Sequence, residues 1–373
     1  MRVAFSFLGA CFVALVVHSA EPNYPVLPIG SPAPDFDLPA TDGRNYSLKD
    51  FGKAQVLAVV FTCNHCPTAQ AYEERLKQLA TDYRDRGVAF VAINPNSPDA
   101  VRLDELGYTD LDDTLESMKL RAAERHFNFA YLDDGPAQAA SKKYGPVATP
   151  HVFVFDKDRR LRYQGRIDDN EREELIKTRD LRLVLDAMVA GKEPPFSQTK
   201  VFGCSTKWGD KAEANRRWRE KVSKEPVTLE PATAAALAEL RNNKSGKVLL
   251  INIWATWCGP CVTEFPDLID TNLRFRHRDF ELVTVAAQFP DEKDRITKFL
   301  QKHQASARNV YFGDTDKYKL MEALDPEWNG ALPHTLLIGP DGRVLYRHTG
   351  ELDFLELRRK IVPALNSIKP WKG

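Results

Sequence analysis

The stretch Ile253-Trp254-Ala255-Thr256-Trp257-Cys258-Gly259-Pro260-Cys261 places two thiols between an apolar run and a helical pattern. Residues 248–253 are apolar enough to predict a buried strand. Past Gly259-Pro260 the apolar residues recur at helical spacing, so we expect Cys258 at the start of a helix and Cys261 one turn further along. Backbone N–H groups and the helix dipole stabilise a thiolate there. The pattern therefore favours Cys258 as a nucleophile, with Cys261 attacking any mixed disulfide formed on it.

A second unit of the same kind lies upstream. Cys63-Asn64-His65-Cys66 follows the apolar run 56–61, and Pro67 suits the first turn of a helix expected to reach about residue 86. Each unit is followed by another apolar strand, an insertion, an x-Pro-His triplet, a β-hairpin and a helix. This internal repeat predicts an α/β chain with two thioredoxin-like folds in tandem, each a central mixed β-sheet with helices on both faces.

The 373 residues are long enough for two domains, each with its own core. We expect four segments: a signal peptide at 1–20, a first domain at 26–192, a linker at 193–226 and a second domain at 227–373. The linker holds Cys204 and a charged helix over 210–222, interpreted as a solvated spacer.

The N-terminus resembles a secretory leader, because Arg2 precedes a mostly apolar run over 3–17 that is too short for a comfortable membrane span. We expect an exported protein of the periplasm or cell envelope, with an uncleaved anchor as the alternative and membrane contact only in that case. Cleavage would remove Cys11 and leave five cysteines, four of them in Cys-x-x-Cys pairs. That inventory is typical of redox chemistry rather than of a disulfide framework.

Beyond these patterns, the chain resembles known families. From about residue 227 onward it is similar to the exported TlpA/ResA-like branch of the thioredoxin superfamily, with Trp257-Cys258-Gly259-Pro260-Cys261 as the shared motif. Residues from about 26 to 208 resemble a redoxin-type family related to the peroxiredoxins (AhpC/TSA-like). The stretches that carry this second resemblance are 61–67, Thr149-Pro150, 165–169 and 203–208.

The resemblance implies roles for individual residues. Cys258 would be the attacking thiol and Cys261 the resolving thiol, beside a cis peptide bond at Leu332-Pro333 that presents backbone to a substrate strand. In the first domain Cys63, Cys66 and Thr149-Pro150 take the same roles. No cofactor is implied.

The chain departs from the families' patterns in three respects. Thioredoxin has a buried Asp six residues before its first cysteine, where this chain has Asn252 and Leu57. Glu264 matches an acid of the TlpA/ResA branch and is the candidate for moving the second thiol's proton. Ala69 stands at the equivalent place in the first domain, which leaves its proton acceptor unnamed. The Pro and Thr that hold peroxide in peroxiredoxins are replaced before Cys63 by Val56 and Val60, which disfavours a peroxidase built on Cys63.

Several residues keep two interpretations. A zinc site formed by the two Cys-x-x-Cys pairs is disfavoured, because each pair precedes its own helix. His65 is expected to stabilise a thiolate, or else to be exposed without a role. His151 and His334, which follow the two x-Pro bonds, either pack on the sheet or act at the site. Cys204 is either a third redox thiol that meets Cys63 or Cys66, or a buried free thiol.

The function predicted from the sequence is an exported thiol–disulfide oxidoreductase with two Cys-x-x-Cys sites. Its partners would be thiols and disulfides of proteins or small molecules, together with an external electron donor. The zero formal net charge gives no general affinity for nucleic acid. Asn64-His65 in place of Gly259-Pro260 indicates that the first site is the more oxidising one. The alternatives are a thiol peroxidase and a non-catalytic redox-sensing or binding module.

Overall fold

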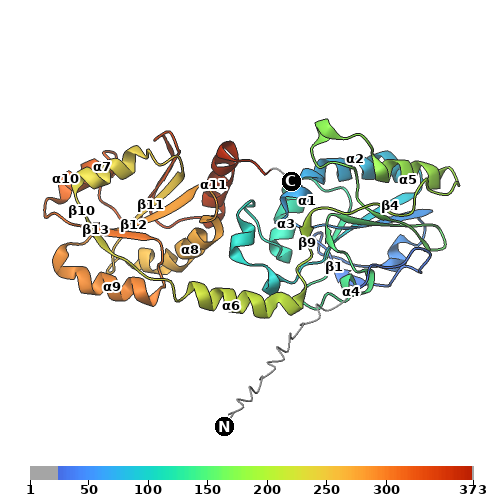
Figure 1. The fold of residues 1–373 in the computed structure, drawn as a ribbon, viewed down its shortest axis with the longest axis horizontal. Coiled ribbons are helices and arrows are strands. Elements are labelled where there is room, and N and C mark those ends of the chain that lie inside the picture. The colour runs from blue at the N-terminus through green and yellow to red at the C-terminus, as the bar shows by residue number, and fades with distance from the viewer. Residues whose placement is uncertain (1–23, 372–373) are drawn as a thin grey trace, which may run out of the picture.

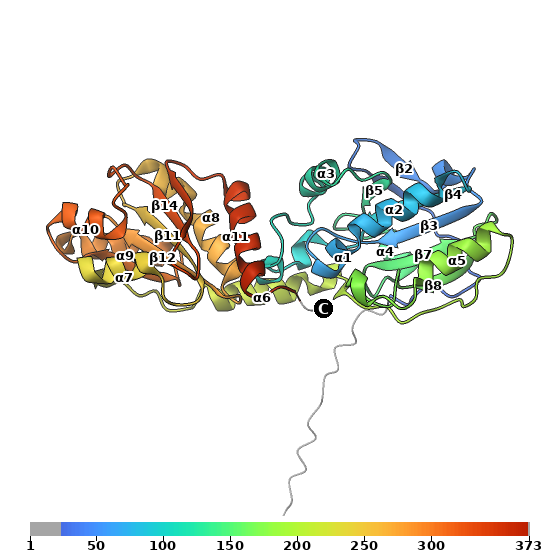
Figure 2. The same cartoon turned by 90° about the horizontal axis from the view of Figure 1, so that it is seen from above.

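The computed structural model describes residues 24–371 as two α/β halves, with helix α6 (Ala212–Val222) running along both (Figures 1 and 2). The expected signal peptide lies outside these residues. Within them, no helix is long and apolar enough to cross a membrane.

The first half is built on a five-stranded sheet of order β5-β4-β3-β7-β8. Strands β3, β4 and β5 are parallel, and β7 and β8 add an antiparallel hairpin. The strands are β3 (Val56–Phe61), β4 (Val88–Asn94), β5 (Ala130–Asp133), β7 (His151–Phe155) and β8 (Leu161–Gly165), with an outlying hairpin of β1 (Asp37–Pro39) and β2 (Asn45–Ser47). The helices are α1 (Pro67–Ala71), α2 (Glu73–Arg84), α3 (Leu115–Glu124), α4 (Ser141–Tyr144) and α5 (Asp180–Val189).

The second half repeats the plan with a six-stranded sheet of order β10-β13-β12-β11-β14-β15. Strand β14 is antiparallel to β11, and β15 is antiparallel to β14, whereas the other pairings are parallel. The strands are β10 (Glu230–Ala232), β11 (Val248–Trp254), β12 (Phe280–Ala286), β13 (Arg308–Phe312), β14 (His334–Ile338) and β15 (Val344–Thr349). The helices are α7 (Ala234–Asn242), α8 (Gly259–Phe275), α9 (Lys293–Lys302), α10 (Lys317–Leu324) and α11 (Phe354–Ile368).

Both sheets are covered on both faces, which explains why their central strands are apolar at every position except Asn252 of β11. Along β3, Val56, Ala58 and Val60 belong to one core cluster, whereas Leu57, Val59 and Phe61 belong to the cluster on the opposite face. Strand β11 divides its side chains between two clusters in the same way. Successive residues of a strand point to opposite faces, so a doubly covered strand needs apolar residues throughout. The predicted fold class is confirmed.

Some predicted elements were wrong in extent. The helix expected from Pro67 to Arg86 is two helices, α1 and α2, that meet at the buried Tyr72. Strands β5, β10 and β13 had not been predicted. They are short and lie at or next to a sheet edge, where the sequence signal is weakest.

The two halves contact each other through the loop around residues 106–111 of the first half. Arg274 of α8 is buried, and its guanidinium donates hydrogen bonds to the carbonyl oxygens of Leu106 and Thr109 at 3.1 and 2.8 Å. Helix α6 is mostly exposed, but it is not a free spacer. Asn215 on α6 is buried and donates a hydrogen bond of 2.9 Å to the carbonyl of Asp99.

Candidate functional site

The second centre lies where β11 passes into α8. Cys258 is the N-cap residue of α8, and its Sγ accepts a hydrogen bond of 3.3 Å from the backbone N–H of Cys261. The two cysteines form a disulfide. Cys261 is completely buried and Cys258 is 6% exposed, whereas the neighbouring Trp257 is 60% exposed. An exposed indole therefore flanks a disulfide that sits at the N-terminus of a long helix.

The cis peptide bond expected at Leu332-Pro333 is present, and Leu332 packs against the core cluster that contains Cys258 and Cys261. Pro333 is buried and Leu332 is half-buried. No strand or bridge pairs with Leu332 among residues 24–371. The backbone beside this disulfide is therefore left without a strand partner in the part of the chain that the structure describes.

Glu264 is buried on the same helix, one turn beyond Cys261. Its carboxylate accepts hydrogen bonds from the side chain of Asn252 at 3.2 Å and from the backbone N–H of Leu352 at 3.1 Å. Burial raises the pKa of Glu264, although these hydrogen bonds oppose the shift. A carboxyl group whose pKa is raised toward neutrality suits proton transfer.

In the first centre, it is the second cysteine of the motif that lies at the start of the helix. Helix α1 begins at Pro67, so its N-cap is Cys66 rather than Cys63, and the Cys66 Sγ accepts a hydrogen bond of 3.4 Å from the N–H of Ala69. Cys258, the first cysteine of its motif, takes that position in the second half. The two motifs share their spacing but present opposite cysteines to the helix N-terminus.

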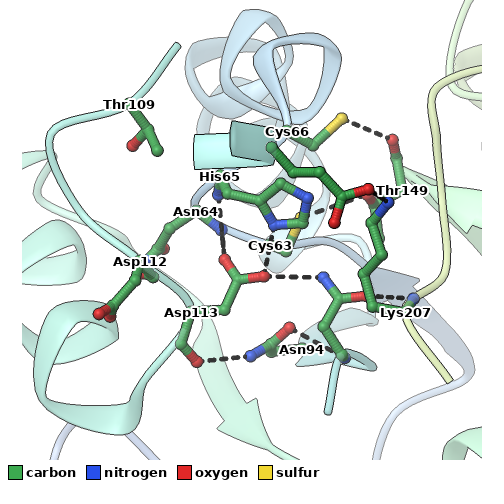
Figure 3. A network of polar contacts seen from close by, with 12 residues as sticks. Cys63, Asn64, His65, Cys66, Asn94, Thr109, Asp112, Asp113, Thr149 and Lys207 are labelled. Carbon is green, nitrogen blue, oxygen red and sulfur yellow. Dashed lines mark hydrogen bonds and ion pairs between the residues drawn. The ribbon is translucent and has the colours of Figure 1, made fainter. Parts of the chain in front are cut away.

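Both thiols of the first centre meet the cis-proline segment, as expected. The peptide bond Thr149-Pro150 is cis. The Cys63 Sγ lies 3.2 Å from the Thr149 Oγ1, and the Cys66 thiol donates to the Thr149 carbonyl at 3.2 Å (Figure 3). Both cysteines are buried.

His65 is buried, so the interpretation of this residue as exposed was wrong. Its Nδ1 lies 2.5 Å from the Asp113 Oδ2, and the other carboxylate oxygen of Asp113 accepts the backbone N–H groups of Asn64 and His65 at 2.9 and 3.0 Å (Figure 3). Burial alone would lower the pKa of His65, but the Asp113 carboxylate reverses this and the net shift is upward. Sequence reasoning missed Asp113, because it lies in the insertion between β4 and β5 and no local pattern links it to Cys63.

These charges act on the thiols in opposite directions. Burial raises the pKa of Cys63, and hydrogen bonding to Cys66 and the Asp113 charge add to this rise. Burial would also raise the pKa of Cys66. However, hydrogen bonds from Cys204 and Cys63, the His65 charge and the Ala69 N–H outweigh it, so the Cys66 pKa is lowered. The thiolate of the first centre is therefore favoured on Cys66.

Cys204, assigned to the linker from the sequence, lies at the first centre. It packs against Cys63 and Cys66, and its strand β9 (Cys204–Ser205) pairs with β6 (Ala148–Thr149). Its hydrogen bond to Cys66, together with burial, raises the pKa of Cys204. The structure thus brings together three thiols that the sequence places far apart.

The two histidines after the cis-prolines are buried in their sheets. The His151 Nε2 lies 2.7 Å from the Gln164 side chain, and burial lowers the pKa of His151 to about 4. The His334 Nε2 lies 3.0 Å from the Asp325 carboxylate, and its Nδ1 lies 2.7 Å from the Thr349 hydroxyl. These contacts favour the packing interpretation for both.

One group could hold a metal ion, since potential ligand atoms of Cys63, His65 and Asp113 all lie within 4.8 Å of one another. However, Asp113 Oδ2 already contacts His65 Nδ1 and accepts a hydrogen bond of 2.8 Å from Asn96, and Oδ1 accepts the two backbone N–H groups. Metal binding would have to break these contacts. The arrangement fits a hydrogen-bonded His–Asp pair better than a ligand set.

Two family models each match one half of the chain. The AhpC/TSA family model matches residues 29–164, and the Redoxin family model matches residues 209–358. The thiol:disulfide interchange protein HelX of Rhodobacter capsulatus is 30% identical over 140 residues, which cover 37% of this chain and 73% of HelX. The chain belongs to the thioredoxin superfamily, with two redoxin-type halves in tandem.

Other relatives of this redoxin chain carry similar names. The thiol:disulfide interchange protein CycY of Rhizobium leguminosarum is 28% identical over 38% of this chain and 69% of CycY. The thiol-disulfide oxidoreductase ResA of Bacillus subtilis is 31% identical over 34% of this chain and 63% of ResA. The crystal structure of a conserved protein from Geobacillus kaustophilus is 35% identical and covers 48% of this chain and 92% of that chain, with a TM-score of 0.44.

Proposed function

We propose that this redoxin chain is a thiol–disulfide oxidoreductase whose second centre reduces disulfides of protein substrates. The observation that carries the proposal is the placement of Cys258: it caps a long helix beside an exposed Trp257, and the nearby backbone of Leu332 has no strand partner among residues 24–371. The names of HelX, CycY and ResA support this class of reaction.

The reaction starts from the reduced pair. The Cys258 thiolate attacks one sulfur of a substrate disulfide, so that a Cys258–substrate bond forms, the substrate S–S bond breaks and the second substrate sulfur leaves as a thiolate that takes up a proton. Cys261 then gives its proton to Glu264 and attacks the Cys258 sulfur. The Cys258–Cys261 disulfide forms, and the first substrate sulfur leaves as a thiolate. The substrate gains the two electrons that the cysteine pair loses.

Glu264 has the properties that the resolving step needs. Residues three apart on a helix share a face, which places Glu264 on the side of Cys261. Burial raises its pKa, so the carboxylate is a stronger base than an exposed glutamate and the resulting acid can return the proton to a leaving thiolate. An external electron donor would reduce the pair again.

We further propose that the protein is exported. The support is the leader-like pattern over 1–20 and the five cysteines that would remain after cleavage. Thiols and disulfides are the proposed partners, and the balanced charge supports no nucleic-acid partner.

The test is capture of substrates by the full chain. A Cys261→Ser variant lacks the resolving thiol, so Cys258 should retain its partners as mixed disulfides that separate on reduction. The matched control, Cys258→Ser/Cys261→Ser, should capture none. If Cys261→Ser captures no more protein than this control does, the second centre does not exchange disulfides with protein substrates.

A thiol peroxidase is a weaker candidate. Counted from Cys66, the cysteine that caps α1, the positions of the peroxide-holding Pro and Thr are occupied by Val59 and Cys63. The hydroxyl is therefore missing in this register as well. Slow consumption of hydrogen peroxide by the reduced chain, unaffected by Cys66→Ser, is the expected result.

A non-catalytic binding or sensing module is the remaining alternative. It shares the cis-proline edges but requires no turnover. Reduction of insulin disulfides by the wild type and its loss in Cys258→Ser would exclude this alternative.

A further inference from the structure

The backbone edge at the first cis-proline is occupied by the chain itself. Strand β9 pairs antiparallel with β6, with Cys204 opposite Thr149 and Ser205 opposite Ala148. Thr149 immediately precedes the cis bond to Pro150. In thioredoxin-like folds this is the edge at which an extended substrate segment would add as a strand, through main-chain hydrogen bonds. Residues 203–205 therefore lie where a substrate strand would otherwise bind.

Gly203 makes this close approach possible. Its φ is +135°, and a Cβ at this position would lie 2.1 Å from the carbonyl oxygen of Thr149. Any residue with a side chain would force β9 away from β6. The two residues that follow β9, Thr206 and Lys207, hold the strand in place. Thr206 donates a hydrogen bond of 2.6 Å to the Pro146 carbonyl, and the Lys207 Nζ lies 2.6 Å from the Glu105 carboxylate.

The strand also delivers a thiol. Cys204 packs against Cys63 and Cys66, and its thiol hydrogen-bonds to Cys66. Cys66 is completely buried and Cys63 is 3% exposed, whereas Cys204 is half-buried and its neighbours Gly203 and Ser205 are exposed. Cys204 is therefore the most accessible of the three sulfurs.

We propose that Cys204 is a third exchange thiol of the first centre, held by β9 in the position of a substrate cysteine, and that this centre reacts with small disulfides rather than with protein strands. The proposal rests on the thiol–disulfide exchange proposed above and extends it to the first half. A protein strand has no free edge to pair with here. A small disulfide needs only access to a sulfur. A pocket of about 370 Å³, lined by Thr68, Phe202 and Gly203 among others, lies beside the residue that precedes Cys204.

The exchange can be written with its atoms and electrons balanced. Cys204 passes its proton to the Cys66 thiolate, to which it is hydrogen-bonded, as its sulfur attacks a small disulfide; the S–S bond of that disulfide breaks, and one half leaves as a thiolate that takes up this proton from Cys66. The Cys66 thiolate then attacks the Cys204 sulfur, which forms the Cys66–Cys204 disulfide and releases the other half as a second thiol. Attack of Cys63 on Cys66 next moves the bond to Cys63–Cys66 and frees the thiol of Cys204. Two thiols of the centre are oxidised, and one small disulfide is reduced.

The test uses the full chain with Cys63→Ser, which stops the exchange at Cys66–Cys204. The reduced variant is treated with oxidised glutathione, and the disulfides are mapped by mass spectrometry after proteolysis without reduction. We expect Cys66–Cys204 to be the main disulfide of the first half. The matched control, Cys63→Ser/Cys204→Ser, should form no internal disulfide at Cys66.

Two results would count against the proposal and can be told apart. If Cys258–Cys261 forms but Cys66–Cys204 does not, the third-thiol proposal fails and the proposed function stands. If the second centre also stays reduced, the proposed function itself fails. The Cys258–Cys261 pair thus serves as an internal control in the same molecule.

A second variant tests the occupied edge without removing a cysteine. Gly203→Ala should displace β9 and raise the rate at which iodoacetamide alkylates Cys66 by about tenfold or more, because the thiol is buried under the strand. Gly191→Ala is the matched control. Gly191 also has a positive φ, of +68°, but no atom within 4 Å of its Cβ position, so its substitution should leave this rate unchanged. If Cys66 is equally protected in both variants, β9 does not cover the centre.

Discussion

The two halves each hold a pair of cysteines three residues apart, but in opposite settings. In the second half, Cys258 caps a 17-residue helix, its cis-proline edge has no strand partner among residues 24–371, and Trp257 stands exposed beside it. In the first half, Cys66 caps a five-residue helix, β9 fills the edge, and both motif cysteines are buried. The Cys-x-x-Cys spacing therefore does not decide which sulfur lies at the helix N-terminus, where a thiolate is stabilised. The residue at which the helix begins decides this, and the segment that covers the cis-proline edge decides whether a substrate strand can pair there.

The proton chemistry differs between the centres as well. The second centre places a single buried carboxyl group, Glu264, one turn beyond Cys261. The first centre has Ala69 at that place and carries instead the His65–Asp113 pair, in which Asp113 comes from the insertion. The same insertion reaches the second half, because Arg274 of α8 binds the carbonyls of Leu106 and Thr109. One segment of chain thus orders the first centre and contacts the helix of the second.

The largest expected effect tests which centre handles protein disulfides. Cys258→Ser should lower the rate of insulin disulfide reduction by about 1000-fold or more, to the background rate, because the attacking thiolate is lost. Cys66→Ser should retain most of the wild-type rate, because β9 already closes the first edge to protein strands. An equal loss in both variants would show that the two centres act in series on insulin, and that the covered edge of the first centre does not exclude it from the reaction.

Glu264→Gln should have the next largest effect. Without the base, resolution by Cys261 should slow by about 100-fold at neutral pH. The sign with pH follows from the raised pKa of Glu264. In the wild type the resolving rate should rise as pH increases through that pKa and the carboxyl ionises, and the variant should lack this rise. Stopped-flow measurement of mixed-disulfide decay across the pH range checks it. An unchanged pH profile would remove Glu264 from the mechanism.

Although Glu264→Gln should slow resolution, it should stabilise the folded state at neutral pH. Burial raises the folded-state pKa of Glu264 above its unfolded value, so its contribution to stability is present at low pH and is lost as pH rises through the folded-state pKa. Gln cannot ionise and lacks this loss. The melting temperature of Glu264→Gln relative to wild type should therefore be higher at neutral pH than at pH 4.

How far the sequence predicts the centres depends on how local each signal is. Both strand–Cys-x-x-Cys–helix units and the start of α1 at Pro67 follow from apolar runs and from proline within a few residues, whereas the two cis-prolines were expected from the family resemblance. Asp113 could not be placed near Cys66 from local pattern, and Cys204 could be placed there only as one of two interpretations. They lie 47 and 138 residues further along the chain, and only the folded insertion and the β6–β9 pairing bring them there. The partners that distinguish the two centres are therefore the long-range ones.

The smallest expected effect concerns the charge of His65, which has no counterpart between the cysteines of the second centre. His65 carries a raised pKa beside Asp113, and its positive charge lowers the pKa of Cys66. His65→Gln keeps a hydrogen-bond donor for Asp113 but removes the charge, so the pKa of Cys66 should rise and its alkylation rate below that pKa should fall by about tenfold. The alkylation rate of Cys66 as a function of pH, read by mass spectrometry, measures the shift.

His151→Gln is the matched control, because burial lowers the pKa of His151 to about 4 and this histidine is uncharged at neutral pH. His151→Gln should not change the pH dependence of the alkylation rate of Cys66. A thiolate that is stabilised more strongly lowers the free energy of the reduced state and makes the corresponding disulfide more oxidising. His65→Gln should therefore also lower the reduction potential of the first centre, whereas the potential of Cys258–Cys261 should not change. A shift of Cys66 that occurs equally in both histidine variants would indicate a packing effect and would remove the His65 charge as the source of the difference between the centres.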